Sequence, residues 1–330
     1  MSPTIADLLD GAHVVALPLV TRFRGLEVRE AMLLRGPRGW TEFSPFAEYD
    51  DAEAATWLAA AIAFGWEATP EALRDSIPVN ATLPAVGPDE VESVLARFPG
   101  ARTVKVKVAE RGQVLADDVA RVRATRAFLG PVGRIRVDAN GGWNVDEAER
   151  AAHALDPFDL EYLEQPCATV DELAELRARL HDWSLPIAAD ESVRKAADPL
   201  AVARAGAADL LVLKAQPLGG VAAALRIAAE AGLPVVVSSA LDTTVGLSMG
   251  AALAAALPEL EYDCGLGTAA LLAADVTEDP LVPRDDGTIE VRRVEPDAAL
   301  LARHAASPER TAWWRERLTR CLELLAIRET

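Results

Sequence analysis

The sequence predicts an α/β protein: a modified (β/α)8 barrel of the TIM type with a smaller α+β capping domain. Three observations lead to this prediction. Short β-branched runs alternate with amphipathic segments over most of the chain, the first 75 residues break that rhythm, and charged residues close five successive strand candidates. Eight strands that are each followed by a helix specify a parallel sheet that closes into a barrel.

The capping domain is predicted to occupy residues 1–75. Its elements are two strands joined by the loop 21–25, then a third strand and a helix, over 13–20, 27–34, 40–45 and 52–64. A C-terminal tail, 281–330, is expected to complete the cap with a strand over 288–294 and a Trp-, Arg- and Leu-rich helix over 308–327.

The barrel is predicted to span residues 76–280. Its strand candidates are 77–83, 104–108, 134–138, 160–164, 186–190, 210–214, 234–238 and 260–264. Amphipathic helices are expected between them at 146–155, 170–180, 199–205 and 221–231. Asn144 and Thr169 are typical helix N-caps, and Gly206 and Gly232 stand where a helix should end.

Composition excludes several classes of partner. The net charge of −18 argues against nucleic acid and against anionic membrane surfaces, which leaves a small molecule as the expected partner. Three cysteines are too few for a disulfide framework or a zinc cluster, so we expect a reducing cytoplasm. The first residues lack the basic region of a signal peptide, and no apolar run approaches the roughly 20 residues of a membrane span.

Lysine is rare in this chain, and its placement is informative. Of four lysines, Lys105, Lys107 and Lys214 lie in apolar, strand-like runs. Burying an ammonium group costs several kcal/mol, roughly, unless it is paired. Lysine, unlike arginine, can lose its proton near neutral pH and act as a base. Compositional bias explains the scarcity of lysine but not these positions, which indicate a chemical role.

Three carboxylates share the same register. Asp138, Glu164 and Asp190 end successive strand candidates, about one strand–helix unit apart, between Lys107 on one side and Lys214 on the other. The C-terminal ends of barrel strands meet at one face, where barrel active sites lie. A single carboxylate there is more often a helix cap, and a single lysine more often a surface residue. The conjunction on five consecutive strands favours a site.

The chemistry that this arrangement suggests is metal-assisted proton abstraction. Three hard oxygen ligands at one rim suit Mg²⁺, with Mn²⁺ as a possible substitute. A metal that binds a substrate carboxylate stabilises the enediolate formed when the neighbouring carbon loses a proton. Lysines on either side of that metal could act on opposite faces of the substrate.

Five motifs along the barrel resemble the muconate-lactonising subgroup of the enolase superfamily. They are Lys105-Val-Lys107, Asp138-Ala-Asn140, Glu164-Gln-Pro166, Asp190-Glu191-Ser192 and Lys214-Ala-Gln-Pro-Leu-Gly-Gly. Residues 39–45 resemble the Gly-x-Gly-Glu-x-x-Pro stretch of that superfamily, with Thr41 replacing the second glycine. The short cap and the segment 263–276 resemble the members that dehydrate a cyclohexadiene carboxylate in menaquinone biosynthesis.

The resemblance implies roles for the matching residues. Asp138, Glu164 and Asp190 would bind Mg²⁺. Lys107 would remove the α-proton and return it to the departing hydroxide in a syn dehydration. Lys214 would steady the enediolate from the opposite face as a cation. Lys105 would assist Lys107 and contact the substrate carboxylate.

The substrate pocket is predicted less directly. The resemblance implies that Asn140 stands behind the metal ligands and also borders the substrate pocket. Groups at the ends of the last strands would line that pocket: Ser238, Ser239 and Gly265. Arg22 and Arg24 of the cap loop could reach a second substrate carboxylate, or they could both be solvated surface residues.

Other functions remain open at this stage. A racemase or epimerase of the same subgroup would use the same two lysines, and a racemase acting on N-succinylamino acids is its nearest form. Dipeptide epimerases carry Asp-x-Asp at the last strand, and Asp263-Cys-Gly265 lacks the second Asp. A Schiff-base aldolase with Lys214 as nucleophile would leave the carboxylates without a role. A catalytically dead binding barrel would not need both lysines and all three carboxylates.

Overall fold

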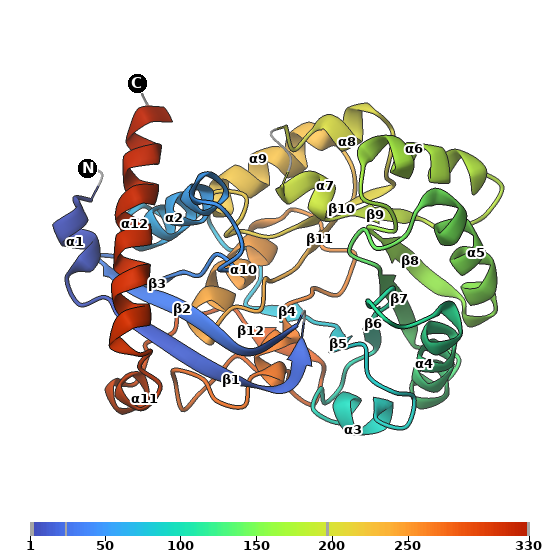
Figure 1. The fold of residues 1–330 in the computed structure, drawn as a ribbon, viewed down its shortest axis with the longest axis horizontal. Helices are drawn as coiled ribbons and strands as arrows, with labels where there is room; N and C mark the ends of the chain where they lie inside the picture. The colour runs from blue at the N-terminus through green and yellow to red at the C-terminus, as the bar shows by residue number, and fades with distance from the viewer. Residues whose placement is uncertain (1–2, 24, 196–197, 329–330) are drawn as a thin grey trace.

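The computed structural model describes residues 3–23, 25–195 and 198–328. The cap strands β1 to β3 and helices α1, α2 and α12 lie together on one side of the molecule. The alternating strands and helices of the barrel lie on the other side (Figure 1).

The cap is built on a three-stranded antiparallel sheet in the order β1-β2-β3. Its elements are α1 (Ile5–Leu9), β1 (His13–Phe23), β2 (Leu26–Gly36), β3 (Gly39–Phe43) and α2 (Asp51–Trp66). The tail contributes α11 (Ala298–Arg303) and α12 (Pro308–Arg328). Helix α12 packs on α2, and α2 packs on β3 (Figure 1). Trp57 and Trp314 are both fully buried in this layer.

The turn between the first two cap strands is shorter than the sequence predicted. After a register shift beyond Pro18, Phe23 pairs with Leu26, so β1 extends into the expected loop 21–25. Arg22 therefore lies in β1 rather than in a loop. Arg24 lies outside the described residues.

Within the described part of the chain, the barrel contains one parallel sheet of seven strands in chain order. They are β5 (Ala81–Leu83), β6 (Thr103–Lys107), β7 (Arg134–Asp138), β8 (Leu160–Glu164), β9 (Ile187–Ala189), β10 (Leu210–Leu213) and β11 (Val235–Val237). Sequential neighbours in a parallel sheet are what repeated strand–helix units produce.

The eighth predicted strand, 260–264, is not a continuous strand. Among the described residues, isolated bridges join Ser238 to Gly265 and Val79 to Cys264 across this part of the barrel. Polar residues alternate in the segment, and its Asp263 carboxylate accepts hydrogen bonds from Thr103 and Arg134. These side-chain hydrogen bonds help to hold the segment in the position that a regular strand would keep through a longer series of backbone hydrogen bonds.

The first predicted barrel strand, 77–83, divides into two. Its first part, β4 (Ser76–Pro78), pairs antiparallel with β12 (Thr288–Glu290) of the tail. Pro78 has no N–H to donate and ends β4, and the chain then enters the barrel as β5. The tail thus also attaches to the base of the barrel.

Helices follow most barrel strands, as the pattern predicted. They are α3 (Val91–Leu95), α4 (Leu115–Leu129), α5 (Val145–Leu155), α6 (Val170–Arg179), α7 (Glu191–Arg194), α8 (Ala201–Arg204), α9 (Val221–Ala231) and α10 (Thr244–Ala256). Short 3₁₀ turns cover Asp156–Phe158 and Gly267–Leu271.

The predicted helix ends are confirmed by their cap geometry. Asn144 and Thr169 accept hydrogen bonds from the N–H groups of Glu147 and Glu172. Gly232 ends α9 with a left-handed φ of 63°, a conformation that costs glycine little. No helix among the described residues is long and apolar enough to cross a membrane.

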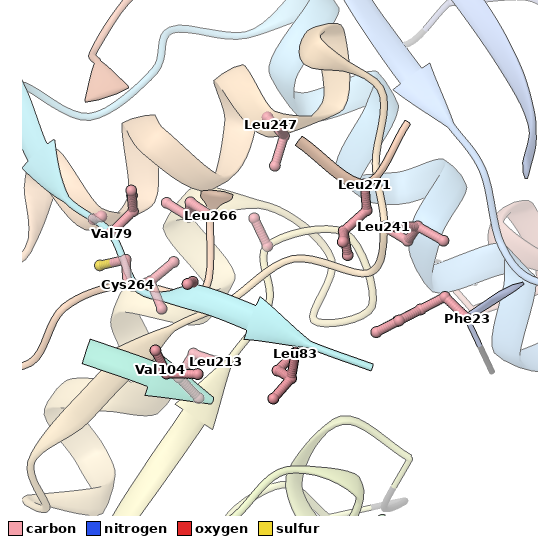
Figure 2. Close-up of a cluster of buried hydrophobic side chains, with 14 of the residues drawn as sticks. Phe23, Val79, Leu83, Val104, Leu213, Leu241, Leu247, Cys264, Leu266 and Leu271 are labelled. Carbon is pink, nitrogen blue, oxygen red and sulfur yellow. The ribbon is translucent and has the colours of Figure 1, made fainter. Parts of the chain in front are cut away.

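The largest cluster of buried apolar side chains among the described residues includes residues of both the barrel and the cap. Figure 2 shows Phe23 of β1 in the same cluster as Leu83, Leu241 and Leu271. Burying a side chain of this size stabilises the fold by about 1.5–3 kcal/mol. Phe23 therefore anchors the tip of the cap sheet over the C-terminal rim of the barrel.

Candidate active site

Strand register brings the predicted ionisable residues to one rim. Lys107 at the end of β6 pairs with Asp138 at the end of β7, and Asp138 pairs with Glu164 at the end of β8. Asp190 directly follows β9, and Lys214 directly follows β10. Because side chains alternate along a strand, Lys105 shares the face of Lys107. The rim thus gathers three carboxylates between lysines.

Each rim carboxylate contacts a lysine ammonium. Lys105 Nζ donates to Glu164 Oε1 at 2.7 Å and lies 3.5 Å from Asp138 Oδ2. Lys107 Nζ donates to Asp138 Oδ2 and, at 2.8 Å, to Asn140 Oδ1. Lys214 Nζ donates to Asp190 Oδ2 at 2.5 Å. Three cations balance three anions within this cluster.

The carboxylates are buried, and their pKa values differ. Burial would raise the pKa of Asp138, but the Lys107 and Lys105 ammonium groups outweigh burial and hold it below its ordinary value. Burial is likewise outweighed at Asp190, where Lys214 and Arg194 lower the pKa. For Glu164, burial and the Asp138 carboxylate dominate and raise the pKa to about 7. The cluster is therefore short of positive charge at Glu164.

The lysines also differ among themselves. Burial alone would lower the pKa of Lys105, but Glu164 and Asp138 outweigh it and raise that pKa above its ordinary value. Burial lowers the pKa of Lys214 despite the neighbouring Asp190. Lys105 therefore stays an ammonium, whereas Lys214 is closer to releasing its proton.

The donor set suits a divalent cation. Within the described ranges, no three or more Asp, Glu, His or Cys side chains are arranged to hold a metal ion. In this structure a lysine Nζ contacts one oxygen of each of the three rim carboxylates. The three buried carboxylates nevertheless form a hard-oxygen set, in which burial and the carboxylates of Asp138 and Asp190 raise the pKa of Glu164. Glu191 Oε2 beside them is buried without a hydrogen-bond partner in the described structure. By the chemistry of their oxygens, Asp138, Glu164 and Asp190 are the residues that could hold such an ion.

A small cavity of about 30 Å³ opens at this rim. It is lined by Phe23, Phe46, Thr82, Lys105, Lys107, Asn140, Lys214, Ser238, Ser239, Ala240, Leu241, Gly265 and Thr268. Four residues that the sequence assigned to the pocket are therefore beside the lysines: Asn140, Ser238, Ser239 and Gly265.

Gly265 and the two serines form one wall of the cavity. A Cβ at Gly265 would lie 2.4 Å from Ser238 Oγ, so no other residue fits there without a shift. Ser239 Oγ donates to the Gly265 carbonyl at 2.9 Å and lies 2.8 Å from Thr268 Oγ1. The local network fixes the shape of this wall.

Sequence reasoning missed part of the lining. Thr82 pairs with Lys105 between β5 and β6, so strand alternation could have found it. Phe23, Phe46 and Leu241 reach the cavity from the cap and from a loop after β11. Their positions depend on how the cap docks, for which the sequence carries no local signal.

Arg22 lies beside the cavity rather than in it. Its exposed side chain lines a neighbouring cleft of about 510 Å³, which shares Phe23, Lys107 and Asn140 with the cavity. The structure therefore places Arg22 at an approach to the rim.

Comparisons with known proteins agree with this geometry. Residues 89–296 match the family model described as Enolase C-terminal domain-like, and residues 14–65 match Enolase N-terminal domain-like. An o-succinylbenzoate synthase of Mycolicibacterium smegmatis is 57% identical over 324 residues, which cover 98% of each chain. One of Thermobifida fusca is 60% identical over 306 residues, covering 92% of this chain and 93% of the relative.

Solved structures share the fold at lower identity. A muconate lactonizing enzyme from Pseudomonas fluorescens superposes with a TM-score of 0.74 at 22% identity, over 89% of this chain and 98% of that one. The L-Ala-D/L-Glu epimerase from Bacillus subtilis gives 0.68 at 22% identity, over 84% and 94%. Both describe the fold and leave the reaction open.

Proposed function

The chain belongs to the enolase superfamily, and from that premise we propose that it is an o-succinylbenzoate synthase. The reaction is the dehydration of 2-succinyl-6-hydroxy-2,4-cyclohexadiene-1-carboxylate in menaquinone biosynthesis. The observation that carries the proposal is the identity of 56–60% to o-succinylbenzoate synthases over nearly the full chain. The fold alone would not separate this reaction from lactonisation or epimerisation.

The reaction requires the residues of the rim to transfer one proton and to assist the loss of one hydroxide. A base takes the proton from the carbon beside the ring carboxylate, and the C–H electron pair enters an enediolate. The pair then forms the ring double bond as the C–O bond breaks, and the proton joins the departing hydroxide as water. The product is aromatic, which makes the second step favourable.

Lys107 is the residue proposed to carry the proton. Asp138 and Asn140 both accept hydrogen bonds from its Nζ, which fixes the position of that atom at the cavity. Lys105 and Lys214 line the same cavity, and Lys214 is proposed to act as a cation on the opposite face. A lysine that keeps its charge there lowers the energy of the enediolate.

A divalent cation is proposed at Asp138, Glu164 and Asp190, with Mg²⁺ as the natural ion and Mn²⁺ as a substitute. When bound, the ion would supply positive charge beside the developing enediolate. Superfamily membership supports a divalent ion, and the raised pKa of Glu164 supports its position at the rim. Asn140, Ser238, Ser239 and Gly265 are proposed to contact the substrate, with Arg22 at the approach.

We keep two further expectations as proposals. The chain divides into the cap 1–75, the barrel 76–280 and the tail 281–330. The enzyme acts in the cytoplasm.

A paired assay tests the function. Purified enzyme with Mg²⁺ should convert the cyclohexadiene substrate to o-succinylbenzoate, which is followed by the ultraviolet absorbance of substrate and product. The same preparation is assayed for racemisation of an N-succinylamino acid. A preparation that racemises efficiently and forms no o-succinylbenzoate would contradict the proposal.

A racemase activity is the second candidate, and one observation favours it. Burial lowers the pKa of Lys214, which brings this lysine nearer to exchanging a proton. In deuterated water, a two-base enzyme would exchange the α-proton for deuterium in both enantiomers of a chiral N-succinylamino acid. Exchange confined to one enantiomer would leave Lys107 as the single base. Borohydride trapping of an adduct at Lys214 would instead indicate the Schiff-base alternative.

A further inference from the structure

One oxygen of each rim carboxylate accepts a hydrogen bond from a group that is not a lysine, and we call these three groups the frame donors. The donors are the N–H of Asn140 to Asp138 Oδ1 at 3.0 Å, the hydroxyl of Tyr162 to Glu164 Oε2 at 3.5 Å, and Nε of Arg194 to Asp190 Oδ1 at 3.0 Å. The other oxygen of each carboxylate contacts a lysine Nζ. In each rim carboxylate, one oxygen therefore contacts a frame donor and the other contacts a lysine.

Arg194 differs from the other two frame donors because it is a charged side chain with several partners. It is 2% exposed and lies in the four-residue helix α7, directly after β9. Besides Asp190, it donates to Glu191 Oε1 at 2.6 Å and to the hydroxyl of Tyr49 at 3.1 Å. Tyr49 belongs to the cap segment between β3 and α2.

The planar guanidinium makes these contacts restrictive. Its N–H groups have fixed directions, so three partners around one fork leave it little freedom to turn. With Asp190 Oδ1 bound to this fork, Oδ2 is the oxygen left for an exchangeable cation. In this structure that cation is the Lys214 ammonium.

We propose that Arg194 is a positioning residue that holds Oδ1 of Asp190, presents Oδ2 to the divalent cation, and links this orientation to the cap through Tyr49. The inference rests on the proposed function only in requiring that a divalent cation binds the rim carboxylates. It predicts that removing the fork weakens metal binding before any substrate is present.

A second buried arginine can serve as a control, because it also contacts the cap but has no contact with a rim carboxylate in the described structure. Arg317 of α12 is 1% exposed and donates to the carbonyls of Phe46 and Tyr49. It therefore holds the same cap segment as Arg194. Its ion pair is with Asp51 at 3.6 Å rather than with a rim carboxylate.

The experiment compares Arg194→Lys with Arg317→Lys. Lysine keeps the charge but its single nitrogen cannot reproduce the planar fork. Mn²⁺ binding is measured by titration calorimetry without substrate, and thermal melting is recorded for each protein. Loss of a residue that orients a metal ligand typically weakens metal affinity by about 10–100-fold. We expect the Mn²⁺ dissociation constant to rise by this factor in Arg194→Lys and to change by less than about twofold in Arg317→Lys.

Tyr49→Phe tests the link to the cap. It removes one hydroxyl and leaves the bond from Arg194 to Asp190, so its effect on Mn²⁺ affinity should be measurable but smaller than that of Arg194→Lys. An effect as small as that of Arg317→Lys would overturn the cap link.

Three results would overturn the role of Arg194. They are an unchanged Mn²⁺ affinity in Arg194→Lys, an equal loss in both arginine variants, and failure of Arg194→Lys to fold where Arg317→Lys folds. Because Mn²⁺ binding is measured without substrate, a wild-type enzyme that binds Mn²⁺ but forms no o-succinylbenzoate would refute the proposed function and leave this test intact.

Discussion

Two buried polar clusters at the C-terminal end of the barrel differ in what holds their charges. In the rim cluster, Asp138, Glu164 and Asp190 each contact the tip of a lysine. The second cluster, at the junction of cap and barrel, consists of Arg29, Glu42, Ser44, Gln216, Asp242 and Thr243. It has two carboxylates and one guanidinium.

The junction cluster is held mainly by donors of the folded frame. Glu42 Oε2 accepts from the N–H groups of Thr243 and Gly246, each at 3.1 Å, and from the Thr243 hydroxyl. Arg29 Nε donates to the carbonyl of Leu241 at 3.0 Å. Burial and the Asp242 carboxylate raise the pKa of Glu42 to about 7.

The contrast separates a cluster suited to chemistry from one suited to attachment. A lysine tip on a flexible stem can leave a carboxylate when another cation arrives, whereas backbone N–H groups cannot. Catalytic turnover should therefore depend strongly on the charges and the metal at the rim. Substitutions at the junction should mainly change the stability of the fold.

The largest expected effect is at Lys107. Lys107→Ala removes the proposed base, and Lys107→Arg puts in its place a guanidinium that stays charged. General acid–base catalysis contributes about 10²–10⁴-fold, so both variants should lose at least that much turnover in the dehydration assay. Lys195→Ala, which changes an exposed lysine outside the rim, is the control. Substantial activity in Lys107→Arg would show that the base is elsewhere.

Removal of the metal should affect the rim almost as strongly. EDTA should abolish turnover, and Mg²⁺ or Mn²⁺ should restore it. Asp190→Asn should reduce turnover by more than the roughly 10–100-fold typical of an outer partner of a metal ligand, with an unchanged circular dichroism spectrum. Full activity of the metal-free enzyme would refute the assignment of the rim.

Two substitutions at Lys214 should show whether catalysis requires its charge or its proton. If it acts as a cation, Lys214→Arg keeps that charge and should lose less kcat than Lys214→Ala. The two variants are compared in kcat and in kcat/KM for the dehydration. Equal losses would indicate that the proton of Lys214 matters and would favour the two-base racemase.

At the junction, Glu42→Gln should change the pH dependence of stability more than catalysis. The pKa of Glu42 rises from 4.5 to about 7 on folding, so its contribution is fully present below pH 4.5 and is lost as pH rises through 7. The loss is on the order of 3 kcal/mol. Between pH 5 and pH 8, the melting temperature of wild type should therefore fall more than that of Glu42→Gln.

The control for this comparison is Glu48→Gln, which changes an exposed carboxylate in the cap segment that follows β3. It should retain the wild-type dependence on pH. Identical melting curves for Glu42→Gln and wild type at both pH values would mean that Glu42 does not titrate in this range.

The smallest expected effect is at Arg22. An exposed charge contact contributes about 0.2–1 kcal/mol, so Arg22→Ala should raise KM by no more than about fivefold and leave kcat unchanged. Steady-state kinetics of the dehydration measure both constants. A change in kcat instead of KM would place Arg22 closer to the reacting atoms than the cleft suggests.

The sequence alone determined the rim. Strand alternation, helix caps and regular strand–helix spacing are local properties, and they predicted that Lys107, Asp138 and Glu164 would meet. Asn144 and Thr169 marked helix starts for the same reason, because a cap needs only its own first turn.

Tertiary structure decided what lies over the rim. Glu42 and Thr243 meet across 201 residues, and Arg194 meets Tyr49 across 145. Such contacts depend on how the cap packs on the barrel, and no local period or motif encodes that packing. For the same reason the bridges at Cys264 and Gly265, and the position of Arg22 in β1, became known only from the folded chain.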